Sequence, residues 1–453
     1  MYTGSLAMQT DFYQITMAAA YHAHGMAGQA TFSLFAHALP PRRGFMVAAG
    51  LEEALDYLES FAFAPEDIDY LAGLGRFDPG FLRVLADTRF SGQVRALPEG
   101  SICFAEEPIL EVTAPIMEAQ LVETFLINVI NLHSTLASKA ARCLLAAQGR
   151  SLVDFSLRRT QGIEAGMAAA RSSALVGFQG TSNLAAARLH GINPVGTMAH
   201  SFVEAFGDEL ASFRAFARTF PDHTVILVDT YDSVAGLHQA VKVAGELMAQ
   251  GHRLVGVRLD SGDLVGLSRQ ARTILDQAGL EQARVVVSGS LDETRIAEML
   301  QKGAQVDLFA VGTKMGSSAD APFLDLAYKL VSYDNRPTLK LSTGKESWAG
   351  AKQVWRRLEQ GGRLDHDLLG LSQEEQKGQP LLETVMSGGR RLGPAAGWRQ
   401  AQQRFREHLA QLPPAILRLT EHAPARVEIS PALQKLQESI RRATLQRQSA
   451  ERL

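Results

Sequence analysis

A repeated pattern in the middle of this chain constrains its fold more than any other sequence feature. Seven short apolar runs occur there, and each ends in Gly or polar residues and is followed by helix-like sequence. In chain order they read SLVDFS, ALVGFQGTSN, NPVGTMAH, TVILVDTYD, LVGVRLDSGD, RVVVSGSLD and LFAVGTKMGSS. Strands buried on both faces read as continuous apolar runs, and right-handed crossovers place them in one parallel sheet. The pattern therefore predicts seven consecutive βα units.

The distances between the later strand ends fit one strand and one crossover helix per unit. Asp229 and Asp260 are 31 positions apart, Asp260 and Ser288 are 28 apart, and Ser288 and Gly312 are 24 apart. Such units form either a closed (β/α) barrel or an open doubly wound sheet. We favour the barrel because polar residues stand at the carboxyl end of every unit, where a barrel gathers its catalytic groups around one mouth. The segment LKLST at 339–343 is a candidate eighth strand.

The sequence outside the repeats predicts a second part that mixes strands and helices. QATFSLFAHALP alternates as an edge-accessible strand does, GLEEALDYLESF has helical spacing, and residues 92–115 resemble short strands broken at Pro and Gly. Near the C-terminus, residues 352–371 resemble a hairpin that turns at Gly361 and Gly362, and Ser430 with Pro431 begins a helical pattern.

The length of 453 residues is enough for two domains. We expect an α+β N-terminal domain at 1–115, bridging helices at 116–149 and a barrel-like catalytic domain at 150–344. We expect residues 345–453 to form a C-terminal hairpin and helices that pack on the N-terminal domain.

Composition narrows the class of protein to a soluble enzyme that acts on small molecules. Hydrophobic residues make up 46% of the chain, charged residues 21%, and the formal net charge is -3, which argues against disorder and against binding of nucleic acid. Cys103 and Cys143 are far apart, which argues against a disulfide framework and structural zinc. The N-terminus does not resemble a signal peptide, and no apolar stretch is long enough to span a bilayer. We expect a cytoplasmic protein without a membrane partner.

Three kinds of side chain follow the predicted strands and would meet at the barrel mouth. Arginines recognise phosphates, carboxylates hold Mg²⁺ or ribose hydroxyls, and Gly, Ser and Thr turns offer backbone N–H groups to an anion. The combination suits a sugar that carries both a phosphate and a diphosphate. The residues concerned are Asp154, Arg158, Arg159, Thr181, Ser182, Thr197, His200, Asp229, Asp232, Arg258, Asp260, Asp263, Ser288 to Ser290, Gly312 and Thr313.

Two loops and one charged motif carry most of this prediction. SGSLDE at 288–293 and VGTKMGSS at 311–318 resemble the phosphate-cradling loops that phosphosugar barrels place on their last strands. RLDSGD at 258–263 sets an Arg and two Asp at the end of a buried strand, where unpaired charges are costly. An internal ion pair between Arg258 and Asp260 is the structural alternative, and we rank it below a ligand site because so many other polar groups share the mouth.

His200 stands apart from the other histidines because it follows a predicted strand terminus. Asp229 closes the next strand in sequence, a natural position from which to accept the second N–H of the ring and fix its tautomer. This arrangement predicts a histidine that acts as a nucleophile or transfers a proton.

Six ordered motifs between about residue 8 and about residue 360 resemble those of the nicotinate phosphoribosyltransferase family. They read TDFYQITM, DFSLRRTQG, GTSNLAAARLHGINPVGTMAHSF, LVDTYDS, GVRLDSGDL and AVGTKMGSS. The resemblance implies an α/β fold, with an irregular (β/α) barrel and an α+β sandwich-like N-terminal domain completed by C-terminal segments. It also implies transfer of phosphoribosyl from phosphoribosyl diphosphate to nicotinate, which gives nicotinate mononucleotide and diphosphate in NAD biosynthesis. In this family the reaction is ligase-type: ATP hydrolysis is coupled through phosphorylation of the histidine in GTMAH, here His200, and Mg²⁺ is a cofactor.

The resemblance also implies a role for each site residue. Tyr13 and Phe155 would stack on the two faces of the pyridine, with Tyr13 supplied by the neighbouring subunit of a head-to-tail homodimer. The catalytic residues would be His200, Asp229, Arg258 and Asp260, of which Asp260 would lie near the ribose and the metal. Arg158, Ser182, Thr197 and Arg258 would bind nicotinate and the diphosphate, and Ser288, Gly289, Gly312 and Thr313 would surround the 5′-phosphate.

Ser182 and Ser156 are informative positions within the matched motifs. Relatives that use nicotinamide have an Asp where this chain has Ser182, and a carboxylate there would repel an acid, so nicotinate is favoured. Ser156 stands where the family has Gly, which bears on the backbone path beside Phe155.

Three alternatives remain open from the sequence. The first is transfer to nicotinamide or quinolinate. The second is a phosphosugar aldolase that uses Lys139 or Lys314 as a Schiff base. The third is a phosphosugar-binding barrel without turnover.

Overall fold

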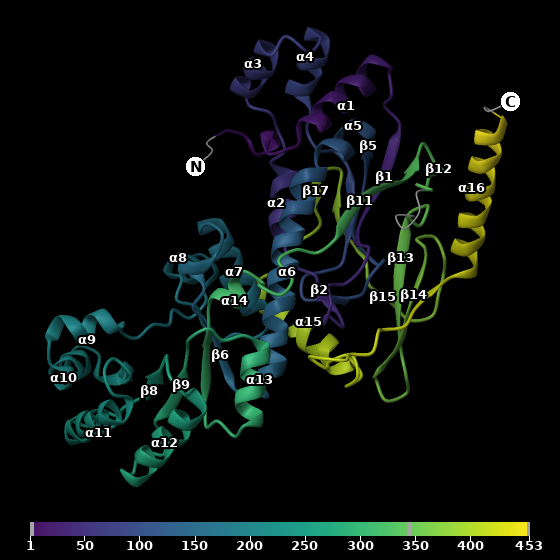
Figure 1. The fold of residues 1–453 in the computed structure, drawn as a ribbon. Helices are drawn as coiled ribbons and strands as arrows, with labels where there is room; N and C mark the ends of the chain where they lie inside the picture. Colours follow the sequence, from purple (N-terminus) through teal and green to yellow (C-terminus); the bar gives the residue numbers. More distant parts are fainter. Residues whose placement is uncertain (1–3, 342–346, 451–453) are drawn as a thin grey trace. The chain divides into compact units, whose positions relative to one another are not determined.

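The repeated apolar runs form a parallel sheet in one of the two units into which the chain divides (Figure 1). The structure is a computed structural model that describes residues 4–341 and 347–450. Unit one comprises Met1–Thr135 and Phe323–Leu453, and unit two comprises Leu136–Pro322. Residues 323–344, which we expected in the barrel domain, belong to unit one because β11 (Leu326–Tyr333) pairs antiparallel with β1 (Gln29–Ala36).

Unit one is built on a seven-stranded sheet in the order β12-β11-β1-β5-β3-β16-β17. The N-terminal segments predicted as strands form β1, β3 and β5, but β1 is an inner strand because β5 and β11 pair on its two sides. Strands from the C-terminal part complete the sheet, as the predicted fold class requires. The remaining bounds are β12 (Arg336–Pro337), β5 (Pro108–Pro115), β3 (Gln93–Ala96), β16 (Glu383–Ser387) and β17 (Arg390–Arg391).

Two smaller sheets complete the strands of unit one. The predicted hairpin forms β13 (Lys352–Leu358) and β14 (Leu364–Leu371), and β15 (Gln379–Pro380) and β18 (Val427–Ile429) flank it. β2 (Met46–Val47) pairs with β4 (Ile102–Cys103).

The helices of unit one cover these sheets and bury their apolar faces in a common core. Ser430 caps α16 by accepting a hydrogen bond from the Leu433 backbone N–H at 3.1 Å, as its position before Pro431 predicts. The helices are α1 (Phe12–Ala23), α2 (Leu51–Glu59), α3 (Pro65–Gly73), α4 (Pro79–Asp87), α5 (Ile116–Leu121), α6 (Glu123–Ala147), α15 (Trp398–Gln411) and α16 (Pro431–Ala450). The division between the units falls within α6.

Unit two contains five parallel strands in the order β6-β10-β9-β8-β7. They are β6 (Ser151–Asp154), β7 (Val225–Leu227), β8 (Gly256–Leu259), β9 (Arg284–Val287) and β10 (Leu308–Val311), and all five lie in predicted βα units. The helices are α7 (Ile163–Val176), α8 (Leu184–His190), α9 (His200–Phe206), α10 (Glu209–Thr219), α11 (Ser233–Ala249), α12 (Leu264–Gln277), α13 (Glu293–Gln301) and α14 (Thr313–Gly316).

The second and third predicted strands of the repeat were wrong in detail. Residues 174–176 end helix α7, and only single parallel bridges, Asp154 to Thr181 and Thr181 to Pro194, continue the sheet beyond β6. Together with β6 to β10 these bridges follow the circular order of a barrel. Hydrogen bonds between the described residues do not close it, so the barrel is irregular.

The predicted eighth strand is not formed by the part of it that the structure describes. Residues 339–341 lie outside the strands and belong to unit one, and residues 342–343 lie outside the described residues.

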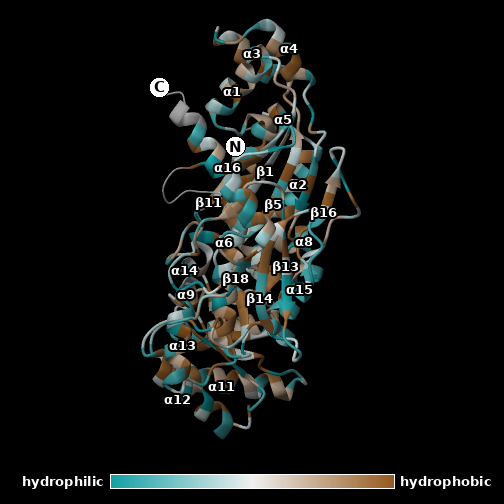
Figure 2. Cartoon of the chain, turned by 90° about the vertical axis from the view of Figure 1, so that its right-hand side faces the viewer, coloured by the Kyte–Doolittle hydropathy of each residue, from teal (hydrophilic) through white to brown (hydrophobic). Residues whose placement is uncertain are grey.

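The outer helices are amphipathic, as covering helices must be. α12 buries Leu264, Ser268, Ala271 and Leu275 along one side, and Figure 2 shows hydrophilic residues on other parts of the same helix. Over residues 4–341 and 347–450, no helix combines the length and the apolar character that crossing a membrane requires.

Candidate active site

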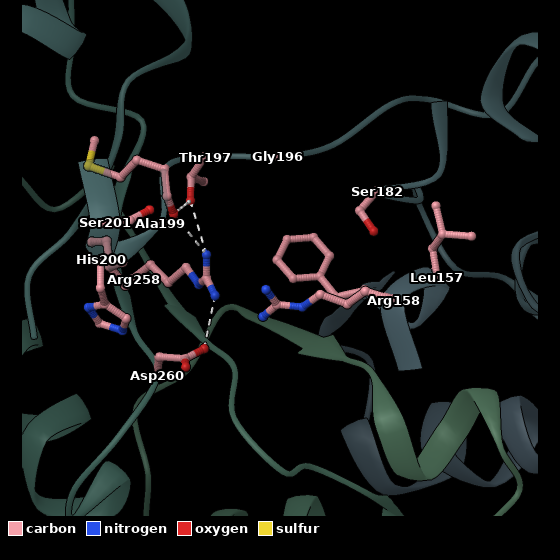
Figure 3. Close-up of a pocket in the computed structure, with 13 residues that line it drawn as sticks. Leu157, Arg158, Ser182, Gly196, Thr197, Ala199, His200, Ser201, Arg258 and Asp260 are labelled. Carbon is pink, nitrogen blue, oxygen red and sulfur yellow. Dashed lines mark hydrogen bonds and ion pairs between the residues drawn. The ribbon is translucent and has the colours of Figure 1, made fainter. Parts of the chain in front are cut away.

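A cavity of about 610 Å³ opens beside the carboxyl ends of β6, β7 and β8 in unit two. Figure 3 shows Arg258 in its middle, with His200 and Asp260 on one side and Arg158 and Ser182 on the other. The predicted site residues that line the cavity are Phe155, Arg158, Ser182, Thr197, His200, Arg258 and Asp260. Residues from four separate βα units therefore meet at one place.

Arg258 connects three βα units through the hydrogen bonds of its guanidinium group: its own unit and those of Thr197 and Ser288. Its Nε donates to Ser288 Oγ at 2.8 Å, its Nη1 to Thr197 Oγ1 at 3.3 Å and its Nη2 to Asp260 Oδ1 at 2.9 Å. The guanidinium carbon also lies 5.4 Å from the centre of the Phe155 ring, within cation–π range. The ion pair that was the structural alternative is present, and it forms part of the cavity wall.

Asp260 is held as an anion within this network. Burial raises the pKa of its carboxyl group, but hydrogen bonds from Ser288 and Arg258 and the charges of Arg258 and His200 outweigh burial, so its pKa lies below the ordinary value. The cavity therefore has a fixed negative group directly beside a fixed positive one.

Asp229 shapes the turn that carries Asp260. Its Oδ2 accepts hydrogen bonds from the backbone N–H groups of Asp260 and Ser261 and from Ser261 Oγ, each at 2.8 Å. Its Oδ1 is buried and has no hydrogen-bond partner among the described residues. Asp229 is thus a buried carboxylate in which Oδ2 accepts three hydrogen bonds and Oδ1 accepts none from the described residues.

The expected pairing of Asp229 with His200 was wrong. His200 begins α9, and its Nδ1 lies 3.1 Å from the Thr230 hydroxyl. The backbone N–H groups of Asp260 and Ser261 donate to the Asp229 carboxylate. Thr230, the residue after Asp229, supplies the hydrogen-bond partner of the His200 ring instead.

Asp154 organises the turn beneath Phe155 and does not line the cavity. It is fully buried, and its carboxylate accepts hydrogen bonds from the Ser156 backbone at 2.9 Å and from Thr181 Oγ1 at 2.7 Å. Burial raises the pKa of Asp154, although these hydrogen bonds oppose the shift. The Ser182 N–H donates to the Asp154 carbonyl at 2.8 Å, which places Ser182 at the cavity wall.

Glu293, the last residue of the predicted SGSLDE motif, begins α13, so the first predicted phosphate loop comprises residues 288–292 in the structure. One position in it fits only glycine well. Gly289 has a φ of 92°, and a Cβ there would lie 2.0 Å from the Asp260 carbonyl oxygen. Ser288 is buried and hydrogen-bonded to both Arg258 and Asp260. This loop therefore contacts the wall of the cavity directly.

The second predicted phosphate loop, residues 312–318, lies against the end of β6. A Cβ on Gly312 would lie 2.9 Å from the Phe155 carbonyl oxygen, and Thr313 begins α14. Gly316 faces Ser156, because a Cβ on Gly316 would lie 2.3 Å from the Ser156 Cβ. The absence of a side chain at 316 makes room for the serine where the family has glycine.

Several site residues were not predicted. Met198, Ser201 and Leu227 line the cavity, and Thr230 contacts His200. Each lies within three residues of a predicted one, so proximity in sequence was the only available signal.

Tyr13 and Lys139 are not among the residues that line the cavity. Tyr13 belongs to unit one, on α1, where it is 49% exposed. Lys139 is buried and pairs with Glu293 and Asp320, which leaves no free amine for a Schiff base there.

Asp260 in the cavity wall and Asp229 beside its turn fit a Mg²⁺ ion that also binds substrate phosphates better than they fit a metal ion held by the protein alone. In the part of the chain that the structure describes, no three His, Cys, Asp or Glu side chains are grouped to hold a metal ion. Mg²⁺ is usually bound through one or two carboxylates together with substrate phosphates. The ionised Asp260 and the unpartnered Oδ1 of Asp229 match that requirement.

Family models match three consecutive parts of the chain. They are the nicotinate phosphoribosyltransferase (NAPRTase) N-terminal domain at 8–131, the NAPRTase family at 150–336 and the nicotinate phosphoribosyltransferase C-terminal domain at 374–437.

Relatives of known name agree with this match. The chain is 48% identical over 418 residues to nicotinate phosphoribosyltransferase pncB2 of Mycobacterium tuberculosis, which covers 92% of this chain and 89% of that protein. It is 39% identical over 389 residues to the nicotinate phosphoribosyltransferase of Bacillus subtilis, with 83% and 79% covered.

A solved structure supports the fold. Human nicotinic acid phosphoribosyltransferase superposes with a TM-score of 0.84 at 31% identity, and the match covers 95% of this chain and 99% of that one.

Proposed function

Because the chain belongs to the nicotinate phosphoribosyltransferase family, we propose that its cavity transfers phosphoribosyl from phosphoribosyl diphosphate to nicotinate, with ATP as co-substrate. The product is nicotinate mononucleotide, which feeds NAD biosynthesis, and the leaving group is diphosphate. The observation that carries the proposal is the Arg258 network, which joins an aromatic ring, an ionised carboxylate and the first phosphate loop in one wall.

The transfer needs charge stabilisation more than a base. The bond between C1 of the ribose and the diphosphate oxygen breaks with its electron pair on the oxygen, and the nitrogen lone pair of nicotinate forms the new bond to C1. The pyridine nitrogen is already nucleophilic. Arg258 would stabilise the charge that develops on the diphosphate, and Asp260 would face the cationic ribose.

The pyridine would lie on Phe155, with Arg158, Ser182 and Thr197 around it. Arg258 beside the Phe155 ring keeps that ring in place. A flat aromatic substrate gains most from such stacking.

Asp229 and Asp260 would hold a Mg²⁺ ion together with the substrate phosphates. A bound Mg²⁺ supplies positive charge that neutralises the diphosphate. The unpartnered Oδ1 of Asp229 supports this assignment, since buried carboxylate oxygens usually have partners.

ATP would donate its γ-phosphoryl group to His200, with release of ADP, and hydrolysis of the phosphohistidine would later yield inorganic phosphate. The Thr230 hydroxyl orients the ring toward the cavity. A phosphoryl group there would add negative charge and acceptor oxygens beside Asp260 and so change how the diphosphate is held.

We place the enzyme in the cytoplasm as a head-to-tail homodimer in which Tyr13 enters the site of the neighbouring subunit. Both cysteines are buried and neither is part of a disulfide, as in a reducing compartment. Tyr13 and Phe12 are 49% and 45% exposed, which suits aromatic residues that are covered by a second subunit.

The proposal is tested first by product formation. Diphosphate should be released only when both phosphoribosyl diphosphate and nicotinate are present, and nicotinamide or quinolinate should replace nicotinate poorly. Ligand binding without diphosphate release would favour the binding barrel. Trapping of a substrate by borohydride would favour the aldolase.

The role of His200 is tested with labelled ATP. We expect acid-labile phosphate on the wild-type protein and none on His200→Ala, because the imidazole nitrogen is the acceptor. Peptide mapping after brief labelling locates the phosphate. Equal labelling of the variant would reject His200 as the acceptor while leaving the transfer reaction itself intact.

A further inference from the structure

The two predicted phosphate loops of unit two are joined by charged side chains that lie outside the cavity. The first loop (288–292) leads into α13, and the second loop (312–318) contains α14. Neither the hydrogen bonds of the parallel sheet nor the Arg258 network connects the two loops to each other. Two separate bridges do so.

The outer bridge is a direct ion pair. Asp292 Oδ2, at the end of the first loop, accepts from Lys314 Nζ of the second loop at 2.8 Å. Asp292 also caps α13 by accepting from the Arg295 N–H at 2.8 Å. The side chains of Asp292 and Lys314 are 16% and 44% exposed, so water reaches the outer bridge only in part.

The inner bridge passes through Lys139 of α6. Lys139, whose side chain is 2% exposed, donates to Glu293, the residue directly after the first loop, and to Asp320 at 2.6 Å, two residues beyond the second loop. Arg142, one helical turn further along α6, donates to Glu293 at 2.9 Å. One buried ammonium group thus holds the ends of both loops.

Burying charged side chains costs free energy, so stability alone does not explain these bridges, whereas a role in fixing the geometry of the loops does. A buried ion pair adds little stability compared with apolar residues of similar volume, because the charges must leave water. Burial raises the pKa of Asp292, but hydrogen bonds from Lys314 and Arg295 and the charges of Lys314 and Lys139 bring its pKa below the ordinary value. The outer bridge therefore persists as an ion pair at neutral pH.

We propose that Lys139 and the Asp292–Lys314 pair are positioning residues that hold the two loops at one separation, so that both loops bind the same phosphate group. The inference rests on the proposed function, which assigns both loops to the 5′-phosphate of the phosphoribosyl group. A preformed separation lowers the entropy that phosphate binding would otherwise lose in ordering the loops.

The outer bridge offers the cleaner test because its residues are partly exposed. Asp292→Asn removes the charge and keeps an oxygen that can cap α13, and Lys314→Met removes the ammonium group. We expect each variant to weaken ribose 5-phosphate binding about threefold to fivefold in calorimetry and to raise the KM for phosphoribosyl diphosphate equally. The KM for nicotinate should stay within about twofold of wild type, since nicotinate does not contact the loops.

Four further variants complete the design. Lys314→Arg should restore most of the affinity, and the Asp292→Asn/Lys314→Met double variant should be no weaker than either single variant, because all remove one shared interaction. Arg295→Met is the matched control: it removes an exposed ion pair with Glu298 on the same helix and should leave both KM values unchanged. Lys139→Met should weaken ribose 5-phosphate binding more than tenfold if the protein folds.

The inference is overturned if Asp292→Asn and Lys314→Met bind ribose 5-phosphate as wild type does. It is also overturned if they raise the KM for nicotinate as much as that for phosphoribosyl diphosphate, which would indicate a general loss of structure. Failure of the proposed function looks different, because the wild-type protein itself would then release no diphosphate.

Discussion

At the scale of single residues, the chemistry of the cavity depends on Arg258 and Asp260. The two charges lie 2.9 Å apart and share Ser288 as a hydrogen-bond partner, so neither can turn toward solvent without leaving the other unpaired. In the proposed reaction, Arg258 would face the negative diphosphate, and Asp260 would face the positive charge that develops on the ribose as its bond to the diphosphate breaks. This fixed arrangement is what electrostatic catalysis requires.

Under the proposed function, Ser182 selects between nicotinate and nicotinamide. A carboxylate introduced by Ser182→Asp would repel the nicotinate carboxylate and accept the amide N–H of nicotinamide. We expect the ratio of kcat/KM for nicotinate over nicotinamide to fall about tenfold or more. Competition between the two substrates measures this ratio.

The matched control for this prediction is Ser182→Asn, which has the size of the aspartate without its charge. It should change selectivity much less than Ser182→Asp. A similar loss in both variants would mean that size at this wall, and not charge, governs the choice.

The site residues that sequence could predict are those with a chemical signature. Arg258, Asp260 and His200 were recognisable because charged or basic side chains at the end of buried strands have few structural explanations. Thr230 was not recognisable, since a threonine hydroxyl is common everywhere and its value depends on a 3.1 Å approach to His200. The choice between Asp229 and Thr230 depends on which backbone N–H groups surround the carboxylate, and no sequence pattern gives that.

At the scale of elements, the turn after β9 gives a sharp prediction. Gly289→Ala would place a Cβ 2.0 Å from the Asp260 carbonyl oxygen, so either the first phosphate loop or Asp260 must shift. We expect kcat/KM for phosphoribosyl diphosphate to fall at least about tenfold, because displacing either group disturbs the Arg258 network. Steady-state kinetics measures this loss.

Gly279→Ala is the control for Gly289→Ala. Gly279 has a comparable φ of 72°, but nothing lies within 4 Å of a Cβ there. The control should cost about 1 kcal/mol of unfolding free energy from backbone strain and leave activity unchanged. Equal activity losses in the two variants would show that backbone strain, not the close approach to Asp260, is responsible.

Strands and helices could be predicted from the sequence where the hydrophobic pattern fits one type of secondary structure. β7 to β10 are short apolar runs with polar ends, each followed by helical sequence, and this combination of length and flanks favours buried strands. The run at 174–176 failed because α7 is itself buried along most of its length, from Ala165 to Val176, so its last turn also reads as a continuous apolar run. Periodicity cannot separate a buried helix from a buried strand over so few residues.

At the scale of the whole molecule, the least predictable feature was which distant segments pair. β3 pairs with β16, nearly 300 residues later, and β1 pairs with β11. The local sequence of a strand does not indicate which distant strand will pair with it. The general expectation that C-terminal segments complete the N-terminal domain was confirmed, whereas the boundary at 344 was not.

The proposed dimer predicts that two variants with low activity regain activity when they form mixed dimers. Tyr13→Ala and Arg258→Gln should each have low activity, but mixed dimers would contain one site with both residues intact. Co-expression in equal amounts should recover about a quarter of wild-type activity, since half of the dimers are mixed and each has one intact site.

The control is co-expression of each variant with itself, which should recover nothing. No recovery in the mixture, with dimers present by light scattering, would mean that Tyr13 does not act across the subunit boundary.

The long-range pairing in unit one also sets an order of events during synthesis. Residues 136–322 are contiguous, so every segment of unit two is translated before β11 and β16. Until then β1 and β3 of the nascent chain have open edges, which are templates for wrong pairing. A ribosome that stalls between residues 323 and 383 would thus release a chain in which unit two is fully translated and unit one has an open strand edge.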